Sequence, residues 1–278
     1  MRGKTIVITG ATSGIGEVAA IRLAEQGARI VFTARDKDRA AATMEKLRRA
    51  NGAVEHAVHM ADLSLLAEMK RVAGEIAEEP QIDVLINNAG AVFGTRQETR
   101  DGLEQTFALN HMSYFVITNL LLPKLKPGAR IVSTASGAHR RAMLDFDDLQ
   151  SRRTYSGFAV YAKSKLCNIL FTRELARRIA GSGVTANCLH PGFVATRFGD
   201  QSGGLLAIGV WAAKRLTAIS EEDGAKTLVY LAASQNVAQV NGAYFYECKI
   251  DMPSPAARDD RAAKRLWDIS AEISGVGQ

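Results

Sequence analysis

Tyr161 and Lys165 are four positions apart in the segment 159–168, AVYAKSKLCN, whose pattern is otherwise that of an amphipathic helix. Four residues make about one helical turn, so both side chains leave the same face and the ammonium group can lie near the phenol. A nearby cation favours the phenolate and lowers the pKa of a tyrosine from its usual value of about 10. Such a phenol can donate or accept a proton at a carbonyl or alcohol oxygen. The same pair also occurs on solvated helix surfaces, so the rest of the chain must decide between the two interpretations.

A glycine-rich turn follows the first apolar run of the chain. TGATSGIG, at 9–16, leads directly into a segment of helical pattern, EVAAIRLAEQG. Gly10, Gly14 and Gly16 would allow a tight turn, close approach of a pyrophosphate to the backbone, and close packing of the helix on the strand. The N-terminus of the helix would then face the phosphates. Its place between the first strand and the first helix favours a dinucleotide-binding turn over a purely structural one.

The elements that must position these residues alternate along the chain. Apolar, β-branched runs predict strands at 5–9, 29–33, 54–60, 82–86, 129–135 and 184–189, with a weaker candidate at 243–246. Helical patterns cover 14–26, 37–50, 64–78, 101–125 and 157–180. This alternation predicts right-handed crossovers and a parallel sheet covered on both faces. We therefore expect an α/β protein with a Rossmann-type, doubly wound parallel sheet in three layers, α/β/α.

The organisation of the chain favours a single domain. No linker, internal repeat or low-complexity tract divides residues 1–278, so we expect one domain in which 193–220 is an insertion that covers the substrate. The first residues, MRGKTIVITG, run directly into a strand pattern and leave no room for a signal peptide. The apolar run at 203–216 meets charge before the roughly 20 residues that a membrane span needs. We therefore expect no integral membrane segment, although this run could still touch a membrane surface.

Charge and cysteine usage exclude several classes of function. The 35 Lys and Arg residues outnumber the 29 Asp and Glu residues by six, and acids lie among the scattered basic residues. This distribution favours solvated helix faces over a nucleic-acid-binding stripe. The three cysteines are far apart and lack metal-ligand spacing, as do the histidines, so we expect no metal site. Reduced thiols in the core predict a cytoplasmic protein.

Five motifs together carry a family resemblance. The glycine turn, NNAG at 87–90, the serine of STASG at 133–137, YAKSK at 161–165 and HPG at 190–192 occur in this order, and their set resembles the short-chain dehydrogenase/reductase family. The resemblance covers nearly the whole chain. The segment 144–179 and the tail from 241 resemble the retinol dehydrogenase branch. Since the membrane anchor of that branch is missing at the N-terminus, we expect a soluble relative of the kind that bacteria encode.

The resemblance implies a role for each member of a catalytic set. Tyr161 would be the general acid in carbonyl reduction and the general base in alcohol oxidation, while Lys165 would lower its pKa and bind the nicotinamide ribose. Ser136 would polarise the substrate oxygen, and Asn110 would hold a water near the lysine. Taken singly, Ser136 could be a turn residue, Asn110 a helix-kink residue and Lys165 a surface charge. Ser136 lacks the G-x-S-x-G elbow that an acyl nucleophile needs.

The end of the second expected strand bears on the choice of cofactor. Ala34 stands where NAD-preferring relatives have an acid, and Arg35 follows it. Arg35 can pair with a 2′-phosphate, and Lys37 and Arg39 add positive charge, although Asp36 counts against this interpretation. We therefore expect NADP(H) in preference to NAD(H). The resemblance implies that the cofactor contacts Gly10, Thr12, Ser13, Gly14, Ile15, Gly16, Arg35, Asp62, Leu63, Asn87, Ala89, Gly90, Tyr161, Lys165, Pro191, Gly192, Val194 and Thr196.

The predicted function is that of an NADP(H)-dependent oxidoreductase of class EC 1.1.1.-, which interconverts an alcohol and an aldehyde or ketone. Apolar residues between 193 and 217 would suit a lipophilic, retinal-like carbonyl, but they would suit helices packed on the sheet equally well. Cells keep NADPH reduced, which favours carbonyl reduction. A non-catalytic NADP(H)-binding sensor or scaffold and a steroid- or sugar-directed dehydrogenase stay open as alternatives. A homodimer through 101–125 and 157–180 is a further option, unless the apolar faces there are core.

Overall fold

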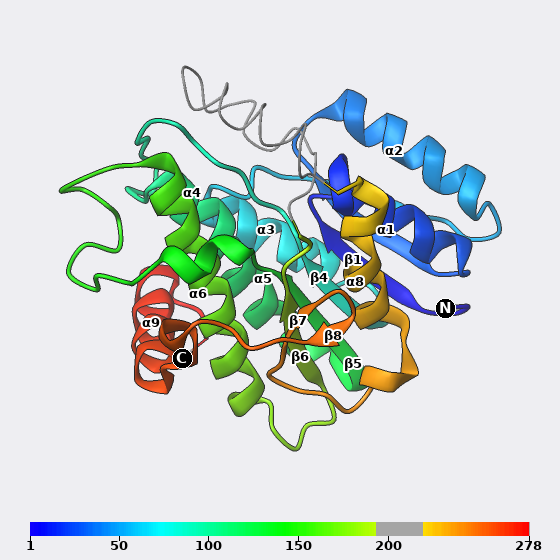
Figure 1. Ribbon diagram of the computed structural model, residues 1–278. Coiled ribbons are helices and arrows are strands. Elements are labelled where there is room, and N and C mark those ends of the chain that lie inside the picture. The colour runs from blue at the N-terminus through cyan, green and yellow to red at the C-terminus, as the bar shows by residue number, and fades with distance from the viewer. Residues whose placement is uncertain (193–218, 278) are drawn as a thin grey trace.

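The computed structural model describes residues 1–192 and 219–277. These residues form one eight-stranded sheet in the order β3-β2-β1-β4-β5-β6-β7-β8 (Figure 1). Neighbouring strands are parallel from β3 to β7, and β8 pairs antiparallel with β7. The doubly wound parallel sheet predicted from the sequence is confirmed.

The strands and helices have the following bounds. The strands are β1 (Thr5–Thr9), β2 (Arg29–Ala34), β3 (Ala57–Met60), β4 (Ile82–Asn87), β5 (Leu125–Thr134), β6 (Thr185–Leu189), β7 (Tyr244–Tyr246) and β8 (Lys249–Ile250). The α-helices are α1 (Gly14–Glu25), α2 (Lys37–Ala50), α3 (Leu66–Ile76), α4 (Gln105–Phe107), α5 (Ser113–Leu121), α6 (Gly157–Arg178), α8 (Glu221–Ala233) and α9 (Asp260–Ser274). A π turn, η1 (Ala108–Met112), joins α4 to α5, and 3-10 turns lie at η2 (Leu122–Lys124), η3 (Gly137–Arg141), η4 (Gln235–Val237) and η5 (Pro255–Arg258).

Two apolar cores cover the two faces of the sheet. Successive residues of a strand point to opposite faces, so Ile6 and Ile8 pack under α1, α2 and α8, while Val7 packs under α3, α5, α6 and α9. Figure 1 shows these two helical layers on either side of the strands. The near-continuous apolar runs of the central strands are therefore needed because both faces are buried.

Three of the predicted boundaries were wrong for local reasons. The expected helix at 101–125 begins only at Gln105, because the Glu104 carboxylate caps the helix by accepting hydrogen bonds from the amides of Thr106 and Phe107. It ends before Leu125, which pairs with Ile82 and starts a longer β5 than expected. The strand expected at 54–60 begins at Ala57. The weak candidate at 243–246 is confirmed as β7.

Two long helices, α8 and α9, were not predicted from their patterns. Both have readable caps: the Ser220 hydroxyl accepts a hydrogen bond from the Asp223 amide, and the Asp259 carboxylate accepts from the amides of Arg261 and Ala262. Gly275 ends α9 with a φ of 66°. Because Ser220 caps α8, the last two residues of the expected insertion belong to the fold, while 193–218 lie outside the described residues.

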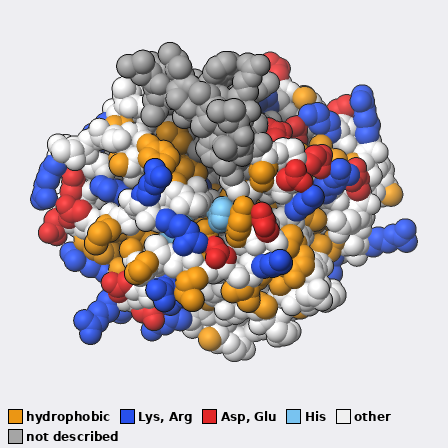
Figure 2. All heavy atoms as spheres, in the orientation of Figure 1, with side chains coloured by type: hydrophobic (Ala, Val, Ile, Leu, Met, Phe, Trp, Pro, Cys, Tyr) orange, Lys and Arg blue, Asp and Glu red, His pale blue; other side chains and the backbone are white. Residues whose placement is uncertain are grey.

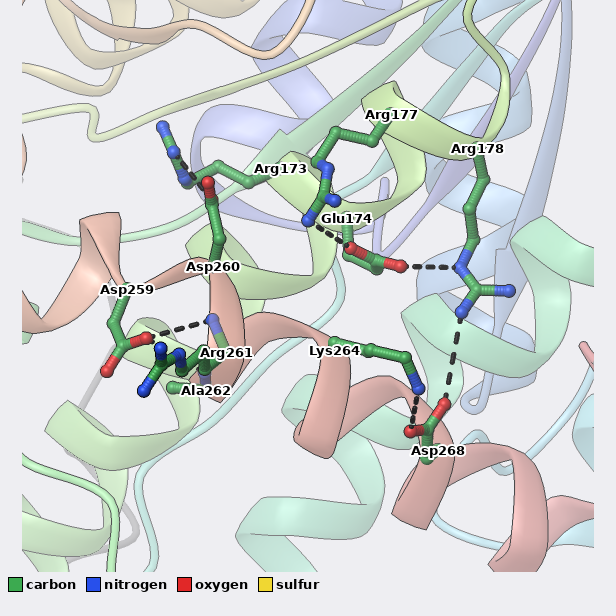
Figure 3. Close-up of polar contacts among 10 residues, drawn as sticks. All are labelled: Arg173, Glu174, Arg177, Arg178, Asp259, Asp260, Arg261, Ala262, Lys264 and Asp268. Atoms are coloured by element: carbon green, nitrogen blue, oxygen red, sulfur yellow. Dashed lines mark hydrogen bonds and ion pairs between the residues drawn. The ribbon is translucent and has the colours of Figure 1, made fainter.

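Helix α9 packs along α6 through ring stacking and through ion pairs, and Figure 3 shows the ion pairs. Trp267 stacks on Phe171 at 5.8 Å and meets the Phe115 ring edgewise at 4.9 Å. Arg173 pairs with Asp260 at 2.8 Å, and Arg178 reaches Asp268 at 3.9 Å. No helix among 1–192 and 219–277 is long and apolar enough to cross a bilayer.

Candidate active site

The carboxyl ends of β1, β4 and β5 are joined by a short line of hydrogen bonds. The Thr9 hydroxyl accepts from the amides of Asn88 and Ala89 at 2.9 and 3.1 Å. The Asn88 amide group donates to the Gly10 carbonyl at 3.0 Å, and its oxygen accepts from the Thr134 hydroxyl at 3.2 Å. The three strand ends that flank the predicted site are therefore held at fixed spacing.

The glycine turn passes so close to β4 that side chains are excluded. Gly10 has a φ of +70°, and a Cβ there would lie 2.7 Å from the Cα of Ala89. A Cβ on Gly16 would lie 2.3 Å from the Gly10 carbonyl oxygen. Ser13 precedes α1 with no side-chain cap, so the first amides of that helix are left for another acceptor. This backbone cradle fits a pyrophosphate at a helix N-terminus.

A hollow of about 300 Å³ continues from the turn towards α2. It is lined by Thr12, Ser13, Gly14, Glu17, Arg39, Ala42, Lys46 and Glu221. Glu17 accepts hydrogen bonds from Thr43 and Lys46, both at 2.9 Å, which ties α1 to α2 across the floor of the hollow. The predicted residues Thr12, Ser13 and Gly14 thus share one cleft with two cationic side chains.

Arg35 and Asp36 follow β2 and differ in their contacts. The Asp36 carboxylate caps α2 by accepting a hydrogen bond from the Arg39 amide at 2.9 Å. Arg35 is exposed beyond the buried end of β2 at Ala34. Asp36, the acid that counted against NADP(H) in the sequence, therefore caps its own helix, α2. Asp62 and Leu63 follow β3, where the Asp62 carboxylate accepts from the amide and hydroxyl of Ser64.

Tyr161 and Lys165 lie on one face of α6, as their spacing predicted, and both are almost entirely buried. The Lys165 ammonium nitrogen lies 5.7 Å from the centre of the Tyr161 ring and donates to the Thr134 carbonyl at 3.0 Å. Burial raises the pKa of Tyr161 to about 12, while a hydrogen bond with Ser136 acts in the opposite direction. Burial also lowers the pKa of Lys165 to about 7. In the chain alone, desolvation therefore outweighs any lowering of the tyrosine pKa by the lysine.

Ser136 lies where β5 gives way to η3, and its side chain meets Tyr161. Its hydroxyl accepts a hydrogen bond from the Ala138 amide at 3.2 Å, and its carbonyl accepts one from His139 at 2.7 Å. Because His139 Nε2 accepts from the Ser254 amide at 3.1 Å, Nδ1 must carry the proton. Through His139, the Ser254 amide of the C-terminal segment thus holds the turn that carries Ser136.

Asn110 lies in the π turn and links two neighbouring elements. Its side chain pairs with both backbone groups of Ala91, each at 2.9 Å, and donates to the Ser164 hydroxyl at 3.0 Å. A Cβ on Gly90 would lie 3.1 Å from the Asn110 side-chain oxygen and 3.4 Å from the Lys165 nitrogen. Asn110 and Lys165 therefore both adjoin Gly90. Both amide hydrogens of Asn110 are engaged, so only its oxygens could accept from a bound water.

The remaining predicted contacts divide into three groups. Ala89, Gly90, Pro191 and Gly192 lie at the carboxyl edge of the sheet, while Ile15 and Gly16 are buried at the start of α1. The side chain of Asn87 is fully buried and donates to the Thr118 hydroxyl on α5 at 2.8 Å. Val194 and Thr196 lie outside the described residues.

Sequence reasoning missed several side chains that hold the site. Asn88, Thr9 and Thr134 form the line across the strand ends, and Ser164 connects Asn110 to the Tyr161 carbonyl, to which its hydroxyl donates at 2.7 Å. Asn88 and Ser164 are inside the recognised NNAG and YAKSK motifs, so their motif positions were a usable signal. Thr134 is likewise inside the recognised STASG motif, but residue type could not reveal that its backbone carbonyl accepts a hydrogen bond from Lys165.

Comparison with known proteins agrees with this geometry. The sequence model described as short chain dehydrogenase matches residues 4–204. The chain belongs to the short-chain dehydrogenase family. Human retinol dehydrogenase 14 is 40% identical over 298 residues, which cover 99% of this chain and 88% of that protein. Human retinol dehydrogenase 13 is also 40% identical, over 99% of this chain and 85% of that protein. This short-chain dehydrogenase is therefore a retinol dehydrogenase-like member.

Solved structures of other members share the fold. A protein from Mycobacterium paratuberculosis has a TM-score of 0.80 and 32% identity, over 99% of this chain and 94% of that one. A short chain dehydrogenase from Burkholderia cenocepacia, solved in complex with NADP, has a TM-score of 0.69 and 26% identity, over 88% of this chain and 96% of that one. The chain is thus an oxidoreductase of a nicotinamide-binding family.

Gly10→Ala should destabilise the fold and weaken cofactor binding. The new methyl group would meet the Ala89 backbone just after β4, in a backbone conformation that costs an L-residue about 1–2 kcal/mol by itself. Gly74→Ala is the matched control: it lies within α3, nothing lies within 4 Å of its Cβ position, and it should stabilise by about 1 kcal/mol. Urea unfolding and NADPH fluorescence titration would measure both. Wild-type binding and stability in Gly10→Ala would contradict the close approach of the turn to Ala89.

Lys165→Met should change how stability depends on pH. The folded pKa of Lys165, about 7, lies below its ordinary value of 10.5, so the unfolded chain binds more protons between these values. The free energy of unfolding attributable to the lysine must then rise with pH across this window and be constant below it. The measurable quantity is the wild-type value minus that of Lys165→Met, obtained by urea unfolding from pH 6 to 10. A difference that is flat or falls with pH would contradict a desolvated lysine.

Proposed function

We propose that the protein is an NADP(H)-dependent oxidoreductase that interconverts an alcohol with an aldehyde or ketone, with Tyr161 as the general acid and base. The observation that carries this proposal is that Tyr161 meets both Ser136 and Lys165, and that Lys165 adjoins Gly90, while the glycine turn of the same sheet edge forms a backbone cradle that excludes side chains. Each of these contacts, taken singly, also occurs in proteins that are not enzymes. A phenol and an amine one turn apart on α6, with a hydroxyl partner from the end of β5, are groups that carbonyl reduction can use.

The side chains have separable tasks in carbonyl reduction. The Ser136 hydroxyl would hold the carbonyl oxygen of the substrate, and the Tyr161 phenol would donate its proton to that oxygen as negative charge develops. When bound, the nicotinamide ring supplies the hydride. Alcohol oxidation would use the same groups in reverse, so that the Tyr161 phenolate accepts the hydroxyl proton. Burial raises the pKa of Tyr161, so the phenol holds at neutral pH the proton that the reductive step would use.

Lys165 would act by charge and by position. Burial leaves its pKa at about 7, so at neutral pH the ammonium is only partly populated in the chain alone. The family resemblance implies that Lys165 binds the nicotinamide ribose. In its charged form, Lys165 would stabilise the Tyr161 phenolate.

Preference for NADP(H) over NAD(H) rests on the end of β2. Arg35 is exposed there, Arg39 and Lys46 line the adjoining hollow, and the Asp36 carboxylate is engaged as the cap of α2. A guanidinium group can pair with a 2′-phosphate through two parallel hydrogen bonds. The solved relative from Burkholderia cenocepacia, which is in complex with NADP, agrees with this choice.

A lipophilic carbonyl is the proposed substrate class. Two apolar side chains near the catalytic set are exposed: Phe158, 43% exposed, lies one turn before Tyr161 on α6, and Met143, 79% exposed, follows η3. Relatives at about 40% identity are named retinol dehydrogenases, which supports a retinal-like aldehyde or another bulky carbonyl. The cover expected from 193–217 lies outside the described residues and stays a prediction.

The cysteines and the surface charge support a cytoplasmic location and small-molecule partners. Burial raises the pKa of the Cys167 and Cys188 thiols to about 12, so both are protonated and unreactive, as suits a protein of the reducing cytoplasm. Figure 2 shows acidic and basic side chains interspersed over the face that it presents, without a basic stripe. Small-molecule substrates are therefore favoured over nucleic acid as partners.

Tyr161→Phe should abolish NADPH oxidation with aliphatic, aromatic and retinoid aldehydes and ketones, because the phenyl ring keeps the packing but has no proton to donate. Absorbance at 340 nm measures turnover, and NADPH fluorescence should show that cofactor binding is kept. Lys163→Ala, on the same helix, is the control that should keep activity. Full turnover in Tyr161→Phe would contradict its role as the acid. Binding of NADPH by the wild type without turnover of any carbonyl or alcohol would favour a sensor.

Arg35→Ala should weaken NADPH binding about tenfold or more and leave NADH binding almost unchanged, because a hydrogen-bonded charge is worth about 1.5–3 kcal/mol. Arg49→Ala, an exposed cation at the far end of α2, is the matched control. Titration of both cofactors against both variants separates a 2′-phosphate contact from a general loss of positive charge. Equal weakening of NADPH and NADH by Arg35→Ala would contradict the assignment.

A further inference from the structure

His111 is a buried polar side chain that the proposed chemistry does not use. It follows Asn110 in the π turn, it is fully buried, and it lies among the rings of Phe107, Phe115 and Phe171 at 5.1, 6.4 and 6.3 Å. Burying an imidazole in such an apolar cage costs folding free energy that a phenyl ring would not, unless the imidazole forms a compensating hydrogen bond.

The hydrogen bond of His111 has a defined direction. Nε2 lies 2.8 Å from the Ser270 hydroxyl on α9, and that hydroxyl donates its own hydrogen to the Leu266 carbonyl at 2.8 Å. The hydroxyl oxygen must therefore accept from Nε2–H, which fixes the tautomer of the ring. Burial lowers the pKa of His111 to about 3, so the ring stays neutral across the physiological range.

The π turn interrupts the regular hydrogen bonding of the helical segment that carries Asn110. Its side chains bond to neighbours on two sides. On one side, Asn110 bonds to Ala91 and Ser164; on the other, His111 bonds to Ser270. Two adjacent residues thus fasten the turn to opposite neighbours.

Helix α9 is docked independently of this hydrogen bond. Trp267 packs on Phe115 and Phe171, the Arg178 guanidinium lies 4.3 Å from the centre of the Trp267 ring, and the ion pairs of Figure 3 run along the outside. Loss of one buried hydrogen bond leaves these contacts in place. The hydrogen bond is therefore not needed merely to hold α9.

We propose that His111 is a positioning residue: its hydrogen bond to Ser270 orients the π turn so that Asn110 holds Ala91 and Ser164 beside Lys165 and Tyr161. The C-terminal helix is thereby part of the machinery that sets the catalytic geometry, although none of its residues touches the site. This inference rests on the proposed function for its kinetic consequence, but not for its structural one.

The decisive variant is His111→Phe. A phenyl ring suits the aromatic cage and leaves the Ser270 hydroxyl donating to Leu266, so folding stability should be unchanged or higher, since replacing a buried polar group by an apolar one of similar shape can stabilise. The kcat for carbonyl reduction should nevertheless fall about tenfold, the effect of about 1.4 kcal/mol on the barrier, with KM changed less than about twofold. His111→Gln, which restores an N–H donor of similar reach, should recover most of the kcat. Lys264→Ala, in an exposed ion pair on α9, should leave kcat unchanged.

A second measurement needs no turnover. The Ala91 amide donates to the Asn110 side chain, so its hydrogen exchange, followed by NMR, should be at least about tenfold faster in His111→Phe and near wild type in His111→Gln. Wild-type kcat in His111→Phe, or wild-type exchange of Ala91, would overturn the proposal. Tyr161→Phe assayed alongside distinguishes the two failures: if it retains activity, the proposed acid is wrong, and the exchange of Ala91 still decides the role of His111.

Discussion

The spacing of the strand ends at the site depends on one line of hydrogen bonds across the carboxyl ends of β1, β4 and β5. Thr9 fixes the amides of Asn88 and Ala89, and Asn88 in turn holds the Gly10 carbonyl and the Thr134 hydroxyl. The glycine turn can approach β4 only because this spacing is set. The same strand end supplies the Thr134 carbonyl that holds Lys165. A parallel sheet brings these ends together, and the side chains determine how far apart they stand.

The second governing constraint is the burial of charge. Lys165 is only 2% exposed, and the Thr134 carbonyl to which it donates is shared with the side chains of Asn168 and Tyr114. Within the described residues no carboxylate forms an ion pair with it, and burial lowers its pKa. Burial therefore acts against the lowering of the Tyr161 pKa that the Tyr161–Lys165 spacing led us to expect.

The bounds of the strands could be predicted well where hydrophobic periodicity and local chemistry agree. β1, β2, β4 and β6 have almost the predicted bounds, because apolar runs buried on both faces have few alternative conformations. Spacing within one helix correctly placed Tyr161 and Lys165 on one face. Residue type alone could not give the direction of the pKa shift, since that depends on burial, which is set by elements distant in the chain. Nor could it reveal that Asn110 pairs with a backbone, or that α9 closes over α5 and α6.

The position of α9 has a consequence for how this chain could meet another copy of itself. The rings of Phe115 and Phe171, on α5 and α6, are covered by Trp267 of the same chain. A second subunit approaching from that side would encounter the arginines and aspartates of α9 and the outer edge of α6 (Figure 3). Any self-association there would be an electrostatic contact between charged helices, sensitive to salt, rather than the burial of an apolar helix pair.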